Sequence, residues 1–227
     1  MGEQADPNWF PPLEQALREP PGLLAAGGDL SPARLLAAYE RGVFPWYSAQ
    51  QPILWWSPDP RMVLFPEEFK CSRSLRKTLR NGPYTTRVDH AFGATIRACA
   101  APRHSGPDTW LNAEMIASYE QLHGLGFGHS IETYSADQLV GGLYGLQLGQ
   151  VFFGESMFSH QPDASKIALA RLVQECRARD IKVVDCQVAS SHLASLGARE
   201  VSRSQFVTLL RLYARRTPCG NWSGAAA

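Results

Sequence analysis

The stretch LVGGLYGLQLGQVFFGESMFSHQPDASK, residues 139–166, decides the fold of this chain. Its pattern predicts two strands, at 139–144 and 150–153, joined by a tight connection at 148–149, where glycine can adopt a positive φ. The second strand leads into Glu155, a carboxylate among apolar and small residues. Because carboxylates in such surroundings are usually paired or functional, Glu155 is a candidate site residue. The structural alternative is a strand end that faces water.

The chain around this stretch divides into two parts. Residues 1–66 are rich in Pro, Gly and Trp and contain one clear helix, over 31–42. After residue 66, periodicity predicts helices over 90–100, 112–123, 164–179, 191–197 and 204–215, and strands over 129–134 and 182–188. The tail after Cys219 is expected to fray. This order predicts an α+β fold, with a small N-terminal domain over 1–66 and a mixed sheet flanked by helices over 67–227.

The composition of the 227-residue chain is that of an ordinary globular protein, with a net charge of +1. Any contact with nucleic acid must therefore come from a local basic cluster. No apolar run is long enough to span a membrane, and the first residues lack the pattern of a signal peptide. The five cysteines and six histidines form no metal-binding motif. We expect a cytoplasmic protein without a metal, a cofactor or a membrane partner.

An acid and an amide lie close together in the predicted strand 182–188. A strand period of two places Asp185 and Gln187 on one face and Cys186 on the other. Such a pair at the end of an apolar strand indicates a site, although it could also only satisfy neighbouring backbone groups. The Gln187 carbonyl can accept a hydrogen bond from an amine while Asp185 fixes the orientation of the amide. A covalent serine or cysteine mechanism finds no support in these motifs.

Four cations without an intervening acid form one stripe of a predicted helix. Arg73, Arg76, Lys77 and Arg80 recur at i, i+3, i+4 and i+7. A solvated face is the usual explanation of such a stripe, but four cations in a nearly neutral chain also suggest contacts with phosphates.

The order strand, hairpin, helix, strand and helix resembles the core of the acetyltransferase (GNAT-type) superfamily. That superfamily holds the pyrophosphate of coenzyme A in a Gln/Arg-x-x-Gly-x-Gly/Ala loop, whereas residues 159–166 here read SHQPDASK. The missing loop argues against a coenzyme A thioester as donor. A coenzyme A-dependent N-acyltransferase that has lost this loop is the second interpretation.

Several motifs in a fixed order extend the resemblance to one family. The chain contains GGDLSPARLLAAYERGVFPWY, ILWWSPDPR, LVGGLYG, FFGESMFS, ASK and DCQV, which together resemble the bacterial leucyl/phenylalanyl-tRNA–protein transferase family over residues 23–210. The resemblance implies an aminoacyltransferase that moves Leu, Phe or Met from aminoacyl-tRNA to the α-amine of proteins with an N-terminal Lys or Arg. The product carries an N-degron. The implied fold is a small N-terminal domain beside an acetyltransferase-like domain.

The resemblance also implies that two aromatic residues hold the 3′-terminal adenosine, namely Trp46 and Trp110. The aromatic residues beside prolines around 44–61 suit a stacking surface for a base. From the residues alone, Trp55 and Trp56 could equally form a small aromatic core.

The implied amino-acid pocket and polar centre come from separate strands and one helix. The pocket wall corresponds to Leu143, Phe152, Leu172 and Val184, and the polar centre to Glu155, Asp185 and Gln187. Leu143 and Leu172 stand where a relative has Met and Phe, which leaves the preference between Leu and Phe open. Strand alternation places Phe152 toward the pocket and Phe153 on the opposite face.

The implied reaction needs no covalent intermediate, because the donor is an activated ester. An α-amine with a reference pKa of about 7.7–8.0 is partly neutral near pH 7. Catalysis then consists of alignment, with Gln187 oriented by Asp185 to position the amine and Glu155 holding a cationic group of one substrate. The expected partners are Leu- or Phe-tRNA and acceptor proteins, bound by a monomer. A module that binds tRNA ends or basic N-termini without transfer is the third interpretation.

Overall fold

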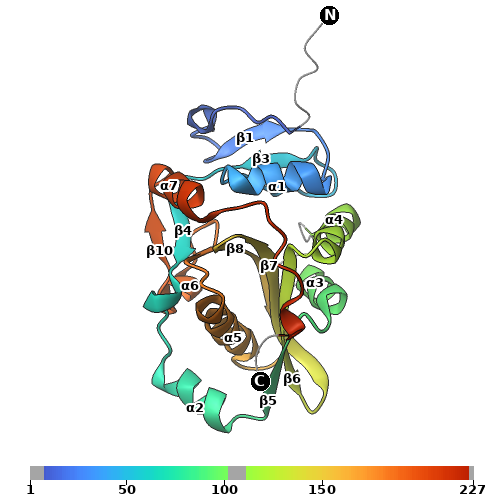
Figure 1. Ribbon diagram of the computed structural model, residues 1–227, viewed down its shortest axis with the longest axis vertical. Helices are drawn as coiled ribbons and strands as arrows, with labels where there is room; N and C mark the ends of the chain where they lie inside the picture. The colour runs from blue at the N-terminus through green and yellow to red at the C-terminus, as the bar shows by residue number, and fades with distance from the viewer. Residues whose placement is uncertain (1–7, 102–110, 225–227) are drawn as a thin grey trace, which may run out of the picture.

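The computed structural model describes residues 8–101 and 111–224, which form two β-sheets with helices around them (Figure 1). The small sheet belongs to the N-terminal part and has the strand order β1-β3-β2. Its strands are β1 (Leu23–Ala26), β2 (Phe44–Pro45) and β3 (Leu54–Trp56), all paired antiparallel. Between β1 and β2 lies α1 (Pro32–Glu40), close to the predicted helix over 31–42.

The large sheet has seven strands in the order β10-β4-β9-β8-β7-β6-β5. In chain order they are β4 (Arg61–Leu64), β5 (Tyr84–Val88), β6 (Gly128–Ser135), β7 (Gln138–Leu148), β8 (Val151–Ser159), β9 (Val183–Asp185) and β10 (Arg199–Val201). The pair β8–β9 is parallel and the other neighbours are antiparallel. The predicted α+β class, a small N-terminal unit beside a mixed sheet flanked by helices, is confirmed. The domain division after residue 66 stays a prediction, and β4, which precedes it, pairs in the large sheet.

Helices cover both faces of the large sheet, with α5 on one face and α3 and α4 on the other (Figure 1). The α-helices after α1 are α2 (Arg73–Asn81), α3 (Phe92–Ala100), α4 (Ala113–Gly124), α5 (Ala164–Ala178), α6 (Ser191–Ser195) and α7 (Arg203–Tyr213), and the 3₁₀ turns are η1 (Leu13–Gln15), η2 (Pro66–Glu68) and η3 (Trp222–Gly224). Each face has its own hydrophobic core. The core on the α3–α4 side continues into the N-terminal unit through Tyr39 and Trp55, which places that unit against the end of the sheet.

Side-chain caps determine where several helices begin. The side chains of Ser72, Asn112 and Ser202 each accept a hydrogen bond from the backbone N–H three residues on. Ser202 forms a full capping box with Gln205, in which two otherwise unpaired N–H groups are satisfied. Ser31 precedes α1 as predicted, but its side chain makes no cap hydrogen bond.

The central hairpin is longer than predicted, because β7 and β8 extend to Leu148 and Ser159. Leu148 pairs with Val151, and the turn between them contains Gly149 with φ of +58°. A Cβ at Gly149 would also meet the backbone oxygen of Tyr213 at 2.5 Å. Glycine is therefore required here both by its backbone conformation and by the close approach of the chain after α7.

Two predictions about the C-terminal half are wrong. The strand predicted over 182–188 ends at Asp185, because the chain turns away from β8 there. The tail after Cys219 does not fray within the described residues, since Trp222 is only 1% exposed and packs in the core on the α5 side. Among the described residues, no helix is long and apolar enough to cross a membrane.

Candidate active site

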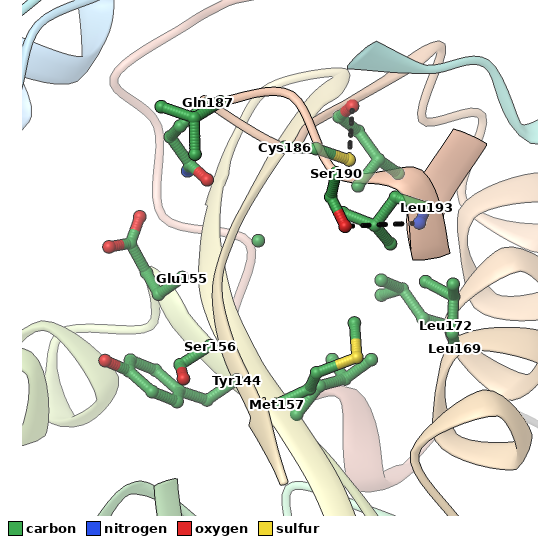
Figure 2. Close-up of a pocket in the computed structure, with 14 residues that line it drawn as sticks. Tyr144, Glu155, Ser156, Met157, Leu169, Leu172, Cys186, Gln187, Ser190 and Leu193 are labelled. Atoms are coloured by element: carbon green, nitrogen blue, oxygen red, sulfur yellow. Dashed lines mark hydrogen bonds between the residues drawn. The ribbon is translucent and has the colours of Figure 1, made fainter. Parts of the chain in front are cut away.

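A pocket opens where β8 and β9 separate. Their parallel pairing runs from Val151 opposite Val183 to Phe153 opposite Asp185. Beyond this point β8 continues along β7 to Ser159, while the chain after β9 leads to α6. The space between the separated strands, α5 and α6 has a volume of about 290 Å³ (Figure 2). This volume lies near the lower limit of roughly 300–1,000 Å³ that is typical of small-ligand sites.

Glu155 enters the pocket from a β-bulge in β8. Tyr144 of β7 pairs with Ser156, and the next residue, Gly145, pairs with Gly154, so Glu155 has no partner on β7. A bulge of this kind adds one residue to a strand and redirects its side chain, and bulges occur often beside active sites. A Cβ at Gly145 would meet the Phe153 carbonyl oxygen at 2.1 Å, so the close pairing here requires glycine.

One carboxylate oxygen of Glu155 is held by a tyrosine that is itself hydrogen-bonded to a second tyrosine. The Tyr119 hydroxyl on α4 donates to Oε2 at 2.8 Å, and the Tyr39 hydroxyl on α1 lies 2.6 Å from that of Tyr119. The other oxygen, Oε1, is buried and has no hydrogen-bond partner among the described residues. Burial raises the pKa of Glu155 to about 7, although hydrogen bonds from Tyr39 and Tyr119 lower it. Sequence reasoning did not connect these tyrosines, which lie 80 residues apart.

Gln187 follows β9 in a left-handed backbone conformation, with φ of +56°. Its backbone N–H donates to Asp185 Oδ1 at 3.0 Å, and its carbonyl oxygen accepts from Met62 N–H at 3.2 Å. Its side-chain Nε2 is buried without a partner among the described residues. Figure 2 shows its amide on the same side of the pocket as the Glu155 carboxylate. The prediction that Asp185 orients this amide is wrong, because Asp185 holds the backbone of Gln187 instead.

Asp185 is fully buried and paired with Arg61 of β4. Arg61 Nε donates to Oδ1 at 2.8 Å and Nη2 donates to Oδ2 at 2.6 Å, a bidentate ion pair in which both side chains are at most 1% exposed. Arg61 Nη1 also donates to the Gly42 carbonyl at 3.0 Å, and the guanidinium lies against the rings of Phe44 and Phe206. Asp185 therefore helps to join the N-terminal unit, β4, β9 and α7.

Cys186 lines the same pocket as Gln187, so its predicted position on the opposite face is wrong. The period of two does not extend past Asp185, where β9 ends. Burial and then the negative charge of Asp185 raise the pKa of the Cys186 thiol, and Sγ donates to the Val184 carbonyl at 3.8 Å (Figure 2). Because only the thiolate is an effective nucleophile, this thiol is unsuited to covalent catalysis at neutral pH.

Three of the four predicted wall residues line the pocket, namely Leu143, Leu172 and Val184. The fourth, Phe152, does not, because its ring is fully buried behind the pocket, 5.7 Å from the ring of Trp222. Phe152 nevertheless packs in the core on the pocket side, and Phe153 packs in the core on the opposite side. The predicted alternation of the two rings across the sheet is confirmed.

Sequence reasoning missed four further apolar lining residues. They are Met157 of β8, Leu169 of α5, Val188 after β9 and Leu193 of α6. Leu169 could have been found, because it lies three residues before Leu172 and therefore on the same helix face. Leu193 could not, because its helix reaches the pocket only after the chain has turned at Gln187.

Of the two predicted adenosine-binding aromatics, Trp46 lies apart from this pocket. Trp46 is 46% exposed, is absent from the pocket lining, and lies with its ring 5.8 Å from that of Trp56. Trp56 Nε1 donates to the Trp46 carbonyl at 2.6 Å, which fixes the backbone below the exposed ring. Trp110 lies outside the described residues.

The predicted basic stripe forms one side of α2, at the end of the molecule opposite the small sheet (Figure 1). Arg73, Arg76, Lys77 and Arg80 are all exposed. None of the four has an ion pair with an acidic residue in the described part of the chain. Their charges are therefore available to a ligand, and the stripe stays a predicted tRNA-binding surface. Residues 8–101 and 111–224 contain no group of His, Cys, Asp and Glu that could hold a metal ion.

Comparison with known proteins shows the family to which this chain belongs. The family model described as leucyl/phenylalanyl-tRNA protein transferase matches residues 63–211, and the model of that family's N-terminal domain matches residues 28–59. The chain belongs to this transferase family. It is 57% identical to the leucyl/phenylalanyl-tRNA–protein transferase of Nitrosomonas eutropha over 88% of this chain and 86% of that protein. The protein of the same name from Azoarcus sp. is 53% identical over 96% of this chain and 93% of that protein.

Solved structures with a similar arrangement are distant in sequence. A GCN5-related N-acetyltransferase from Kribbella flavida matches 75% of this chain and 61% of that chain, at 10% identity and a TM-score of 0.42. The C-terminal domain of a lysylphosphatidylglycerol synthetase described as putative, from Agrobacterium fabrum, matches 73% of this chain and 55% of that chain, at 13% identity and a TM-score of 0.43. Both scores lie below 0.5, and the fold therefore stands on the strand order and pairings described above.

Proposed function

We propose that the pocket takes the Leu or Phe side chain of an aminoacyl-tRNA and that the enzyme transfers this residue to the α-amine of proteins with an N-terminal Lys or Arg. One observation supports this most directly. Three of the residues that line this apolar cavity carry a buried polar atom without a partner among the described residues, namely Tyr144 Oη, Glu155 Oε1 and Gln187 Nε2. Buried polar atoms without a partner are costly, so they are expected where a ligand supplies the missing hydrogen bonds. The new N-terminal Leu or Phe would act as an N-degron, and Met is a third donor residue to be tested.

In this proposal the chemistry is direct aminolysis of the donor ester. The amine nitrogen forms a bond with the ester carbonyl carbon, the bond from that carbon to the ribose oxygen breaks, and the ribose oxygen leaves with a proton. Gln187 Nε2 donates to the ester carbonyl oxygen, which becomes negative during the attack. Glu155 Oε1 accepts from the incoming amine, and a carboxylate with a pKa of about 7 can take up the proton that the amine loses and pass it to the departing ribose oxygen.

Two surfaces outside the pocket are the proposed contacts with the rest of the tRNA. Trp46 presents an exposed ring on which the terminal adenine can stack. The basic stripe on α2 is the proposed contact with acceptor-stem phosphates. The assignments of Trp46 and of the basic stripe hold only if the protein binds tRNA, so measurements of tRNA binding test them as well.

The loop before α5 argues against the coenzyme A interpretation. Asp163 occupies the N-cap position of α5, and Lys166 donates to its carboxylate at 2.8 Å. A helix N-terminus that receives a pyrophosphate offers unpaired N–H groups and positive charge. Here a carboxylate is already present at that place and the nearby lysine is paired with it.

The proposed function is tested by incubating the protein with radiolabelled leucyl-tRNA and a peptide that begins with Arg. Acid-stable label on the peptide is the expected result, and the same peptide with an acetylated N-terminus should remain unlabelled. Binding of both substrates without transfer would contradict the proposal and favour a binding module. Thermal stabilisation by acetyl-coenzyme A, without any by leucyl-tRNA, would favour the coenzyme A interpretation.

A further inference from the structure

Trp222, three residues after Cys219, packs beside Phe152 in the core on the pocket side of the large sheet. Its side chain is 1% exposed and belongs to the same core as the pocket residues Leu143, Leu172 and Val184. Its ring does not line the pocket itself. Trp222 therefore acts on the pocket only through residues that it touches.

The position of Trp222 is fixed by polar and aromatic contacts on every side. Its ring stacks on His129 with centroids 4.3 Å apart and an angle of 14°, and the Arg179 guanidinium lies 4.8 Å from the ring centroid. Nε1 donates to Gln147 Oε1 at 2.9 Å, the backbone N–H donates to Asp89 Oδ2 at 2.7 Å, and the carbonyl accepts from Arg179 Nη2 at 3.0 Å. These contacts fix both the ring and the backbone of Trp222.

Toward the sheet, Trp222 contacts two residues that pair across neighbouring strands. Phe152 of β8, beside the Trp222 ring, pairs with Gln147 of β7, which accepts the indole hydrogen bond. On its other side Phe152 pairs with Val184 of β9, and Val184 lines the pocket. The Phe152 ring fills the space over Gly145, where a Cβ would lie 2.6 Å from the ring. A shift of the Phe152 ring would therefore move the sheet side of the pocket.

Toward the helix, Trp222 is tied to α5 through Arg179. Arg179 follows α5 directly, and its Nε donates to Glu175 Oε2 on the helix at 3.2 Å. Leu172, on the opposite wall of the pocket from the sheet, lies seven residues before Arg179. Seven residues are two helical turns, so both lie on the same side of α5, about 10 Å apart along its axis. Trp222 thus connects the two walls, the sheet and α5.

We infer that Trp222 is a positioning residue that sets the separation of α5 from the sheet and, through it, the size of the donor side chain that the enzyme accepts. This inference rests on the proposed function of the pocket. Without Trp222, Phe152 and α5 lose a shared support and the pocket widens. The kcat/KM for transfer of the larger Phe residue then rises relative to that for transfer of Leu.

The test measures kcat/KM for phenylalanyl-tRNA and for leucyl-tRNA with the wild-type protein and with Trp222→Ala and Trp222→Phe. One methylene in a hydrophobic pocket changes discrimination by roughly 10–200-fold, so an indirect widening is expected to raise the Phe/Leu ratio by about three- to tenfold in Trp222→Ala. Trp222→Phe keeps an aromatic ring against His129 and loses the hydrogen bond to Gln147, so its ratio should be intermediate. The KM for the acceptor peptide should not change. Leu212→Ala removes an exposed side chain on α7 and serves as the control, with an unchanged ratio.

The Phe/Leu ratio of kcat/KM distinguishes a positioning role of Trp222 from a role in stability alone. A loss of folded protein lowers transfer from both donors equally and leaves the Phe/Leu ratio as it was. An unchanged ratio in folded Trp222→Ala, or in Trp222→Phe if Trp222→Ala does not fold, overturns the inference while the proposed function stands. No transfer from either donor by the wild-type protein overturns the proposed function, and this inference with it.

Discussion

Glu155 and Asp185 are two carboxylates at neighbouring strands of the same sheet, and their oxygens are held in opposite ways. Both Asp185 oxygens face the Arg61 guanidinium, and Oδ1 also accepts from the Gln187 backbone. Glu155 has one oxygen held by Tyr119 and one without a partner among the described residues. The charge of Asp185 is thus neutralised by the protein, whereas burial raises the pKa of Glu155 to about 7. We propose that Asp185 serves the fold and that the unpaired oxygen of Glu155 serves the substrate.

The largest expected effect is the loss of stability in Asp185→Asn. Breaking a buried ion pair by removing one partner typically costs about 3–5 kcal/mol, because the other charge stays buried and unpaired. Urea denaturation should therefore show a much lower free energy of unfolding. Arg61→Met should be destabilised to a similar extent, and the double variant less than the sum of the two. If Asp185→Asn proves as stable as wild type, the structural role of the pair is wrong.

Glu155→Gln should reduce transfer strongly while the protein stays folded. The amide keeps the shape of the side chain but cannot accept a proton, and the loss of one such group typically lowers kcat by about 100-fold or more. The measurement is single-turnover transfer of leucine to an Arg peptide. Wild-type activity in this variant would mean that the free oxygen of Glu155 has no part in the reaction.

The same variant tests the raised pKa through stability. The pKa of Glu155 in the folded protein, about 7, is above its ordinary value of 4.5, so the folded protein binds more protons than the unfolded chain between these values. The contribution of protonated Glu155 to stability is fully present below about pH 4.5 and is lost as the pH rises through 7. The wild-type protein should therefore lose stability relative to Glu155→Gln over this range, by at most about 1.4 kcal/mol per pH unit for one proton. If the difference in free energy of unfolding between wild type and Glu155→Gln does not change with pH, the raised pKa of Glu155 is contradicted.

Gln187→Asn should have a smaller effect on transfer and almost none on stability. Asn tolerates the left-handed backbone at this position, and the backbone contacts with Asp185 and Met62 remain. The shorter side chain moves the amide away from the ester, so kcat should fall by about tenfold, with the tRNA KM unchanged. A large loss of stability would show that the Gln187 amide is needed for the fold. Gln187 would then have a structural role like that of Asp185.

The smallest effects are expected far from both carboxylates, on the basic stripe. Single changes of Arg73, Arg76, Lys77 or Arg80 to Ala should raise the KM for tRNA by a few-fold and reduce the slope of log K against log salt by about 0.7–0.9 for each lost phosphate contact. Transfer from an aminoacyl-adenosine donor, which has no acceptor stem, should stay unchanged. Equal losses with both donors would show that the stripe supports the fold instead of binding tRNA.

Local patterns predicted much of this molecule. The helices appear close to their expected bounds, because capping residues and apolar periodicity act within a few residues. The central hairpin appears because Gly149 supplies the turn that joins two apolar strands. Glu155 was also found locally, as a carboxylate in apolar surroundings.

The errors all arise from contacts between distant segments. Strand periodicity fails after Asp185 because contacts with Met62 hold Gln187 in a left-handed turn, 125 positions later in the chain than Met62. The bulge at Glu155 depends on the register with β7, which the pattern of β8 alone does not contain. Trp222 is held by Asp89 and Gln147, so a short polar tail that looks frayed in sequence is anchored through this one buried residue.

The contrast between the two carboxylates is tested most directly by the single-turnover rate of transfer per folded molecule, measured for Asp185→Asn and Glu155→Gln at low temperature, with the folded fraction determined by circular dichroism. Asp185 makes no contact with the free side of the pocket, so folded Asp185→Asn should transfer leucine within about tenfold of wild type, whereas Glu155→Gln should be about 100-fold slower or worse. The reverse order, with a fast Glu155→Gln and an inactive but folded Asp185→Asn, would contradict the assignment of Asp185 to the fold and Glu155 to the substrate.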